Sequence, residues 1–393
     1  MSFTAKSLNI TDFAYLNIYL QWLVPITIIQ SFGIPLLANI YVSGNKISLE
    51  KYIKIFFSII LKFSFLAIPL IYFTASQILN LNQEITLIYM MLIYVNLSLY
   101  FISQLLQSKK LIFESYLTAN YGQRGFILSV IPTIIIGVCY YLGLSLDLKN
   151  ILIFILIGSL STLFFGIYFL KNKATSSLSN EGSTSTKELI TEGFKISLNE
   201  IINTSIFPFI FTFALYYFGE ETTGKYQIYV RLLFISLYFY QSILVSILIP
   251  EIFTLFKSNK KNLFNKVRFI MRRTLLYGLC IIAIFLSIND VLISNVFDKI
   301  YLLPFNEYLI LSLILLIGLI LNIGVPLLNY AKLNKEVLIL RGFGLMIGFI
   351  ILQFLTMSFP KIISINLIML ILYVLPNLIV FSYWYSIIRR SIK

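Results

Sequence analysis

Long apolar runs separated by short polar segments make up most of the chain. Because about 20 apolar residues in a helix are enough to cross the hydrocarbon core of a bilayer, each long run is a candidate transmembrane span. The pattern predicts about eleven spans. They lie at 13–41, 53–78, 85–106, 122–143, 151–170, 188–219, 224–253, 275–296, 308–330, 337–359 and 363–388. Such a pattern is typical of a polytopic all-α membrane protein.

The run at 188–219 has the length of a span but carries polar residues along one side. At about 100° per residue, one stripe of this helix contains Glu192, Lys195 and Asn199, with Glu200 just beside it. An ionised group at the bilayer centre costs roughly 2.5 to 3.5 kcal/mol on insertion scales. The stripe is therefore expected to face other helices or a water-filled cavity. The alternative is an ordinary ion pair between Glu192 and Lys195 at the membrane surface.

The run at 224–253 carries a second polar face, which contains Gln227, Arg231, Tyr238 and Gln241. A guanidinium can bind a diphosphate through two parallel hydrogen bonds, and Tyr and Gln side chains suit sugar hydroxyls. These residues are candidates for a binding surface. The alternative is that Arg231 reaches out to the lipid headgroups.

Lys62 lies near the middle of the run at 53–78. Because a side chain cannot easily reach the membrane surface from there, Lys62 is expected to face the interior, either as a cavity-facing cation or as the partner of a buried acid or carbonyl. Two weaker candidates follow. Asn322 is interpreted either as part of a broken helix or as a hydrogen-bonding residue between helices, and Arg341 as an anchor at the membrane surface or a close-packing site.

The composition narrows the class of protein. The chain has 393 residues, of which 59% are hydrophobic and 12% charged, and its mean hydropathy of +0.91 excludes a soluble globular protein. The net charge of +14 does not indicate nucleic-acid binding, because the basic residues lie in short loops between apolar runs. With no histidine and only two cysteines, both in apolar runs, the chain has no Ser-His-Asp triad or disulfide framework, and we expect no metal, cofactor or enzymatic activity.

The connecting segments alternate in charge. The segments after the first, third, seventh and ninth runs are rich in Lys and Arg, as is the C-terminus, whereas the intervening segments are neutral or acidic. By the positive-inside rule the basic segments and the C-terminus are cytoplasmic.

A Ser/Thr-rich segment at 171–187 is the longest polar stretch and is interpreted as a cytoplasmic linker. It divides the chain into an N-terminal bundle at 1–170, with about five spans, and a C-terminal bundle at 188–393, with about six. The bundles resemble degenerate copies, because one common offset aligns Tyr15 with Tyr226 and Gln30 with Gln241. Internal repeats are common in transporters.

Three stretches together resemble a known family. They are ITDFAYLNIYLQWLVPITIIQSFGIPLLANIYVSGNK at 10–46, TEGFKISLNEIINTSIFPFI at 191–210, and YYFGEETTGKYQIYVRLLFISLYFYQSILVSILIPEIFTLF at 216–256. They resemble spans of Wzx-type polysaccharide flippases, of the superfamily that also holds the multidrug and toxic compound extruders (MATE). The shared features are Gly193, Gly224 with Tyr226, and Pro250. The family pattern is twelve spans in two pseudo-symmetric, MATE-like bundles, so the resemblance implies that this chain lacks the first span.

The resemblance also implies a function. It implies that the protein moves undecaprenyl-diphosphate-linked oligosaccharide units across the bacterial inner membrane by alternating access, for O-antigen or another surface polysaccharide. The cavity would be cationic and aromatic; Lys195 would bind a phosphate or an acidic sugar, while Glu192 or Glu200 would couple transport to protons or sodium. Membrane lipids, a polysaccharide polymerase and a chain-length regulator are the expected partners.

Three alternatives stay open. A MATE-like extruder of small molecules would have an acidic central cavity, whereas the charges in mid-span here include Lys62, Lys195 and Arg231. A membrane polysaccharide polymerase would carry its catalytic groups on a sizeable outer loop, and no outer segment here exceeds about fifteen residues. A lipid-binding scaffold without a transport cycle is disfavoured by the polar stripes.

Overall fold

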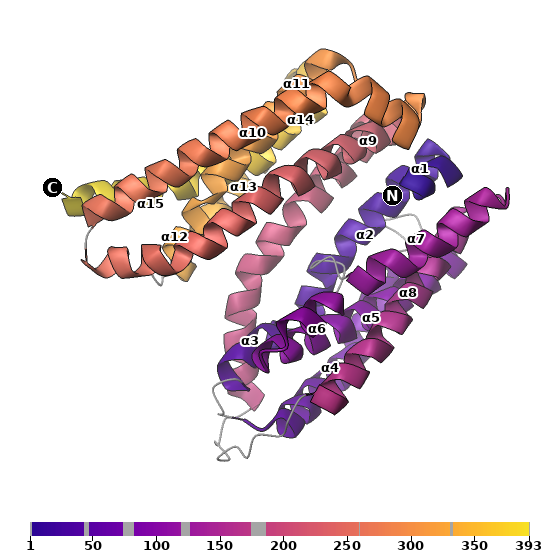
Figure 1. The fold of residues 1–393 in the computed structure, drawn as a ribbon, viewed down its shortest axis with the longest axis horizontal. Coiled ribbons are helices and arrows are strands. Elements are labelled where there is room, and N and C mark those ends of the chain that lie inside the picture. The colour runs from indigo at the N-terminus through magenta and orange to yellow at the C-terminus, as the bar shows by residue number, and fades with distance from the viewer. Residues whose placement is uncertain are drawn as a thin grey trace. The chain divides into compact units, whose positions relative to one another are not determined.

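The computed structural model describes residues 2–42, 47–73, 82–118, 126–173, 186–258, 260–330 and 333–392. Within these ranges the secondary structure is entirely helical (Figure 1). The chain forms two compact units, Met1–Pro208 (unit 1) and Phe209–Lys393 (unit 2). The predicted linker at 171–187 lies mostly outside the described residues, so its role as the boundary between bundles stays a prediction.

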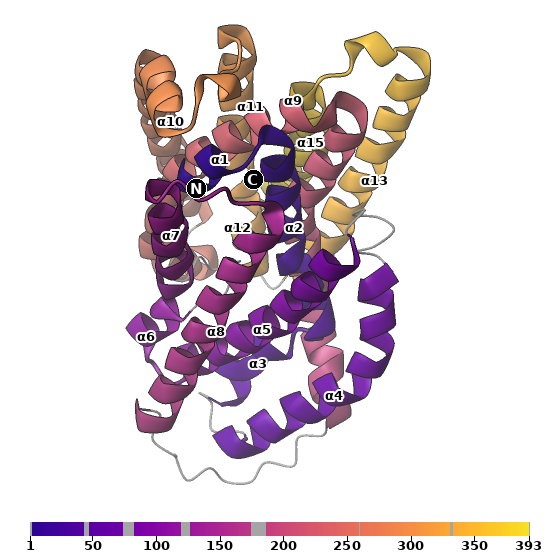
Figure 2. The same cartoon turned by 90° about the vertical axis from the view of Figure 1, so that its right-hand side faces the viewer.

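Unit 1 is built around α5. Its helices are α1 (Ser2–Ser7), α2 (Ile10–Gln30), α3 (Ile34–Tyr41), α4 (Leu49–Phe73), α5 (Gln83–Ser108), α6 (Ile112–Leu117), α7 (Phe126–Tyr141), α8 (Leu148–Lys173) and the beginning of α9 (Thr186–Ser258). Gly219 divides α9 into a first arm before it and a second arm after it, and unit 1 includes the first arm as far as Pro208. Helix α5 packs against α2, α3, α6 and α8, and Figure 2 shows α5 and α8 side by side. Inside this packing, the rings of Phe56 and Phe101 stack with centroids 3.7 Å apart.

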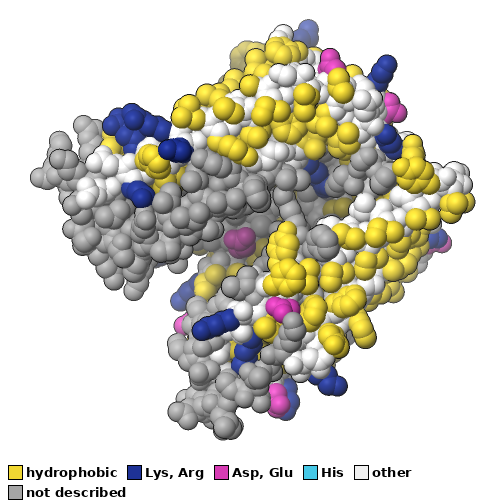
Figure 3. Space-filling view, in the orientation of Figure 1, with side chains coloured by type: hydrophobic (Ala, Val, Ile, Leu, Met, Phe, Trp, Pro, Cys, Tyr) yellow, Lys and Arg dark blue, Asp and Glu magenta, His cyan; other side chains and the backbone are white. Residues whose placement is uncertain are grey.

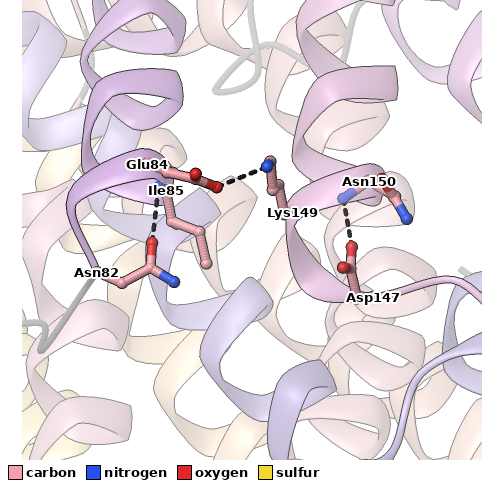
Figure 4. Close-up of polar contacts among 6 residues, drawn as sticks. All are labelled: Asn82, Glu84, Ile85, Asp147, Lys149 and Asn150. Carbon is pink, nitrogen blue, oxygen red and sulfur yellow. Dashed lines mark hydrogen bonds and ion pairs between the residues drawn. The ribbon is translucent and has the colours of Figure 1, made fainter.

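Helices α5 and α8 begin beside each other. Asn82 caps α5 by accepting a hydrogen bond from the backbone N–H of Ile85, and Asp147 caps α8 in the same way from Asn150 (Figure 4). Between the two starts, Lys149 Nζ lies 2.5 Å from Glu84 Oε2. Both side chains are exposed, so the pair adds little stability. The shared starting end means that the two helices run in the same direction, as the predicted alternation of spans requires.

Unit 2 is organised around its last helix. It contains the second arm of α9, α10 (Lys260–Val296), η3 (Lys299–Tyr301), α11 (Phe305–Asn322), α12 (Gly324–Tyr330), α13 (Asn334–Ser358), η4 (Pro360–Ile362), α14 (Ile365–Met369), the π-helical turn η5 (Leu370–Val374) and α15 (Leu375–Ile392). Helix α15 packs against α10, α11, α12 and α13. Gly344 allows this close approach, because a Cβ there would lie 2.8 Å from the Cα of Pro376.

Each predicted span falls on a helix of the described residues, and eight of those helices are long and apolar enough to cross a membrane. Many of their large apolar side chains are exposed, such as Phe164 at 70% and Leu276 at 62%. Figure 3 shows hydrophobic side chains in yellow over much of the visible surface. Such surfaces suit contact with lipid rather than with water. The protein is therefore a multi-pass, all-α membrane protein, as the sequence predicts.

The structure shows breaks within or between four of the predicted spans. The run at 13–41 is two helices, because Phe32 and Gly33 have positive φ values of 49° and 66° and turn the chain between α2 and α3. The run at 308–330 is divided at Ile323 between α11 and α12, next to Asn322, where the sequence allowed a broken helix; Ile323 itself keeps a helical φ of −57° and ψ of −28°. The runs at 188–219 and 224–253 both lie on α9, and Gly219, with a non-helical φ of 76° and ψ of 177°, separates them where the sequence predicts the first run to end.

Candidate functional site

The start of α9 packs directly against the corner between α2 and α3. A Cβ on Gly33 would lie 2.1 Å from the carbonyl oxygen of Gly193, and a Cβ on Gly193 would lie 2.4 Å from that of Phe32. Only glycines allow two backbones to approach this closely. Gly193, one of the residues that carries the family resemblance, is therefore a packing residue that fixes α9 in unit 1.

This contact determines the environment of Glu192. The hydroxyl of Tyr41, at the end of α3, donates a hydrogen bond of 2.6 Å to Glu192 Oε2. The sequence left open an ion pair between Glu192 and Lys195. Among the described residues, the structure has no such pair. A short hydrogen bond to a carboxylate is stronger than a neutral one, so Tyr41 orients the Glu192 carboxylate.

The rest of the polar stripe is only partly covered. Asn199 and Glu200 are half-buried, whereas Lys195 is exposed. Ser197, about 140° around the helix from Glu192 and so outside the stripe, is buried against the α2–α3 corner, where a Cβ on Gly33 would lie 2.8 Å from its Cβ. The stripe therefore lies beside this contact and not within it.

Lys62 lines a cavity of about 350 Å³ between α4 and the start of α9. Its other lining residues are Lys51, Lys54, Ile55, Ser58, Ile59, Phe63, Thr186 and Ile190. We call this the lysine cavity. Its three lysines are exposed, and none of them forms an ion pair with a residue that the structure describes. Lys62 has the environment of a cavity-facing cation, the first of the two roles that the sequence allowed.

The lysine cavity suits an anion. Of the lining residues given above, three carry an ammonium group, two carry a hydroxyl and none is acidic. This lining favours a negatively charged group such as a phosphate.

The second polar face, on the second arm of α9, is more buried than expected. Gln227 is 0% exposed and Arg231 is half-buried in unit 2. The side chains of Tyr238 and Gln241 lie outside the described residues. Gln227 is therefore a core residue of unit 2, and only Arg231 retains some exposure among the described candidates on this face.

Tyrosines on the same arm fasten it to the rest of unit 2. The hydroxyl of Tyr226 donates a hydrogen bond of 2.9 Å to Glu307 Oε2 on α11. The hydroxyl of Tyr229 accepts one of 3.2 Å from the backbone N–H of Leu303, and its ring lies 4.7 Å from that of Tyr308. Glu307 is thus held by a tyrosine, as Glu192 is in unit 1.

A buried arginine in unit 2 was not among the predicted site residues. Arg341 is 2% exposed, and its Nη2 donates hydrogen bonds of 2.7 Å to Asn322 Oδ1 and 2.9 Å to Asn377 Oδ1. Asn377 in turn donates to the backbone carbonyl of Tyr373, in the π-helical turn. Arg341 therefore links α11, α13 and α15, which fits the close-packing role and not the surface anchor, the two roles that the sequence allowed. The predicted role of Asn322 in hydrogen bonding between helices is confirmed.

No protein-family profile and no curated protein matches the sequence. Solved structures do match the fold. An inward-facing multidrug resistance MATE family transporter of the MOP superfamily has a TM-score of 0.65 at 11% identity, over 98% of this chain and 93% of that one. A MATE mutant has a TM-score of 0.56 at 12% identity, over 97% and 85%. An outward-facing MATE family transporter of the same superfamily has 0.52 at 13%, over 96% and 85%. The chain has the MATE-like fold expected from its sequence.

Proposed function

We propose that the protein is a flippase that moves undecaprenyl-diphosphate-linked oligosaccharide units across the bacterial inner membrane, for O-antigen or another surface polysaccharide. Three observations support this proposal: the multi-pass helical fold, the likeness of that fold to transporters, and the resemblance of 10–46, 191–210 and 216–256 to polysaccharide flippases. In this proposal the C-terminus is cytoplasmic, and a polysaccharide polymerase and a chain-length regulator receive the translocated units.

The observation that carries the choice of substrate is the lysine cavity. A diphosphate presents several oxygens with delocalised negative charge, and ammonium groups bind such oxygens through charge-assisted hydrogen bonds. The cavity volume of about 350 Å³ is that of a small-ligand site, large enough for a diphosphate while the sugars extend beyond it.

The lysines form a ladder along α4. Lys51, Lys54 and Lys62 share one face with Ser58, and the first and last of them lie about 16 Å apart along the helix axis at a rise of about 1.5 Å per residue. Lys62 lies in the middle of α4 (Leu49–Phe73), whereas Lys51 lies in its first turn. In the proposed mechanism the diphosphate first contacts Lys51 and Lys54 near the cytoplasmic surface and then Lys62. The lysines only bind and release it, so no covalent bond changes.

A MATE-like extruder of small molecules is the second candidate. It is favoured by the solved structures that share the fold, two of which are described as multidrug resistance transporters. An extruder of cations would need accessible carboxylates. Glu192 is exposed and Glu307 is half-buried, but the lysine cavity, whose named lining residues include three lysines and no acid, would repel a cation.

The test uses cells that lack the gene and carry either the intact protein or a variant. Lys62→Ala should reduce surface polysaccharide and cause lipid-linked oligosaccharide to accumulate, at an unchanged level of the protein. Lys361→Ala is the matched control, because Lys361 is exposed in η4 and does not line the lysine cavity. Resistance to cationic dyes is measured in the same strains. Normal surface polysaccharide together with lost dye resistance in the Lys62 variant would contradict the flippase proposal and support the extruder.

A further inference from the structure

A second cavity, of about 450 Å³, lies in unit 2 between the first half of α10, the end of α11 and α15. Its lining is mainly apolar and includes Met271, Leu275, Ile320 and Phe381. Leu275 is 41% exposed, and the neighbouring Leu276 on α10 is 62% exposed. This cavity therefore opens on a surface that suits the hydrocarbon chains of a lipid.

Two arginines border the same cavity. Arg268 and Arg272 both line it, and a spacing of four residues places them on one face of α10. Both are exposed, and neither forms an ion pair with any residue in the described ranges. Figure 3 shows Lys and Arg side chains gathered beside hydrophobic ones at the end of unit 2 where α10 begins and α15 ends. The two guanidinium groups are therefore placed to bind an external anion.

The next arginine differs from these two. Arg273 does not line the cavity, and its guanidinium carbon lies 4.9 Å above the ring of Phe269, which it contacts as a cation–π pair. Arg273 is exposed, as are Arg268 and Arg272, and it carries the same charge. It therefore provides a control that separates the cavity from general surface charge.

A buried donor lies at the wall of the cavity. Trp384 lines it and is 2% exposed, and its Nε1–H has no hydrogen-bond acceptor among the described atoms. A buried N–H without an acceptor costs about 1 to 3 kcal/mol, so such groups are rare in folded proteins. An oxygen of a bound molecule would satisfy it.

The three observations specify one class of molecule: an apolar body, an anionic head and oxygens that accept hydrogen bonds. We propose that this cavity binds an anionic phospholipid of the surrounding membrane, with its phosphate between Arg268 and Arg272 and an acyl chain over Met271 and Leu275. Basic residues next to spans attract the anionic lipids of the cytoplasmic leaflet, and the start of α10 follows the most basic of the connecting segments, which is predicted to be cytoplasmic. The site is separate from the lysine cavity and does not depend on the proposed function.

The chain provides its own probe. Trp22 and Trp384 are its two tryptophans, so Trp22→Phe leaves only the indole that lines the cavity. This variant is placed in bilayers of zwitterionic lipid with increasing amounts of brominated phosphatidylglycerol, whose bromine atoms quench tryptophan fluorescence on contact. We expect quenching to saturate at a low fraction of the anionic lipid. Arg268→Ala and Arg272→Ala should each raise the half-quenching fraction about fivefold, whereas Arg273→Ala should leave it unchanged.

Three results would overturn the proposal. Equal quenching by brominated phosphatidylcholine would show that the site does not select the anionic head. An equal shift in Arg273→Ala would reduce the effect to general surface charge. Protection from quenching by a small amount of added polyprenyl diphosphate would assign the cavity to that lipid instead. Arg268→Lys and Arg272→Lys keep the charge and control for misfolding. They should still raise the half-quenching fraction, because an ammonium cannot bind phosphate in the two-pronged manner of a guanidinium, but by less than the alanine variants.

Discussion

Lys62 in unit 1 and Arg341 in unit 2 are both cations within a predicted span, but their surroundings differ. Lys62 is exposed in the lysine cavity. The other lining residues given above include two more lysines and no acidic residue. Arg341 is 2% exposed and donates to two asparagine oxygens. A cation whose hydrogen bonds are made by the fold stabilises the fold, and a cation directed into a cavity is available to a ligand. Charge in a span does not by itself distinguish these two roles.

The largest effect on stability is expected from Arg341→Leu. The change removes the donor to Asn322 and Asn377 and leaves both buried amide oxygens without it. Hydrogen bonds to a charged group contribute about 1.5 to 3 kcal/mol each, so the free energy of unfolding should fall by about 3 kcal/mol or more. The thermal unfolding midpoint of the purified protein measures this, with Arg273→Ala as the control. An unchanged midpoint would mean that Arg341 does not stabilise unit 2, and the contrast with Lys62 would be lost.

Gly193→Ala should have the next largest effect. The added methyl group would lie 2.4 Å from the carbonyl oxygen of Phe32, so α9 would have to move away from the α2–α3 corner. Forced overpacking of this kind typically costs about 1 to 3 kcal/mol. Gly342→Ala is the matched control, because a Cβ at Gly342 would meet no atom within 4 Å. Equal unfolding midpoints for the two variants would contradict the packing role of Gly193.

Tyr41→Phe and Tyr226→Phe should have smaller effects. Each removes one hydroxyl that donates to a carboxylate, of Glu192 and Glu307 respectively. Because Glu192 is exposed and water can replace the lost donor, Tyr41→Phe should lower the free energy of unfolding by only about 1 kcal/mol. Glu307 is half-buried, so the loss in Tyr226→Phe should be greater. The reverse order of the two unfolding midpoints would show that burial of the carboxylate does not set the cost.

Lys62→Ala should have the smallest effect on stability. No described residue is ion-paired with Lys62, so its removal should change the thermal midpoint little while it lowers surface polysaccharide. The measurement is the unfolding midpoint of the same variant that is used in the cell assay. A large drop in the midpoint would show that Lys62 stabilises unit 1, as Arg341 is expected to stabilise unit 2.

The sequence by itself determined the class of protein and the position of its helices. Apolar runs of sufficient length predict helices because backbone groups in a bilayer must bond within their own segment, and each predicted run falls on a helix. The breaks were less predictable. Helical geometry ends at both Gly33 and Gly219, which have positive φ values of 66° and 76°. The polar residues after Gly219 predicted the second break, whereas no polar segment marks the first, inside a continuous apolar run.

The tertiary structure decided which polar residues are partners. Tyr41 and Glu192 are 151 positions apart and Arg341 and Asn377 are 36 apart, and no periodicity in the sequence relates such pairs. Helical spacing gives the side of a helix on which a residue lies, but the neighbour on that side depends on how the helices pack. For that reason the sequence could name Lys62 and Arg341 as charges within spans, and only the fold placed the first in a cavity and the second in a network of hydrogen bonds.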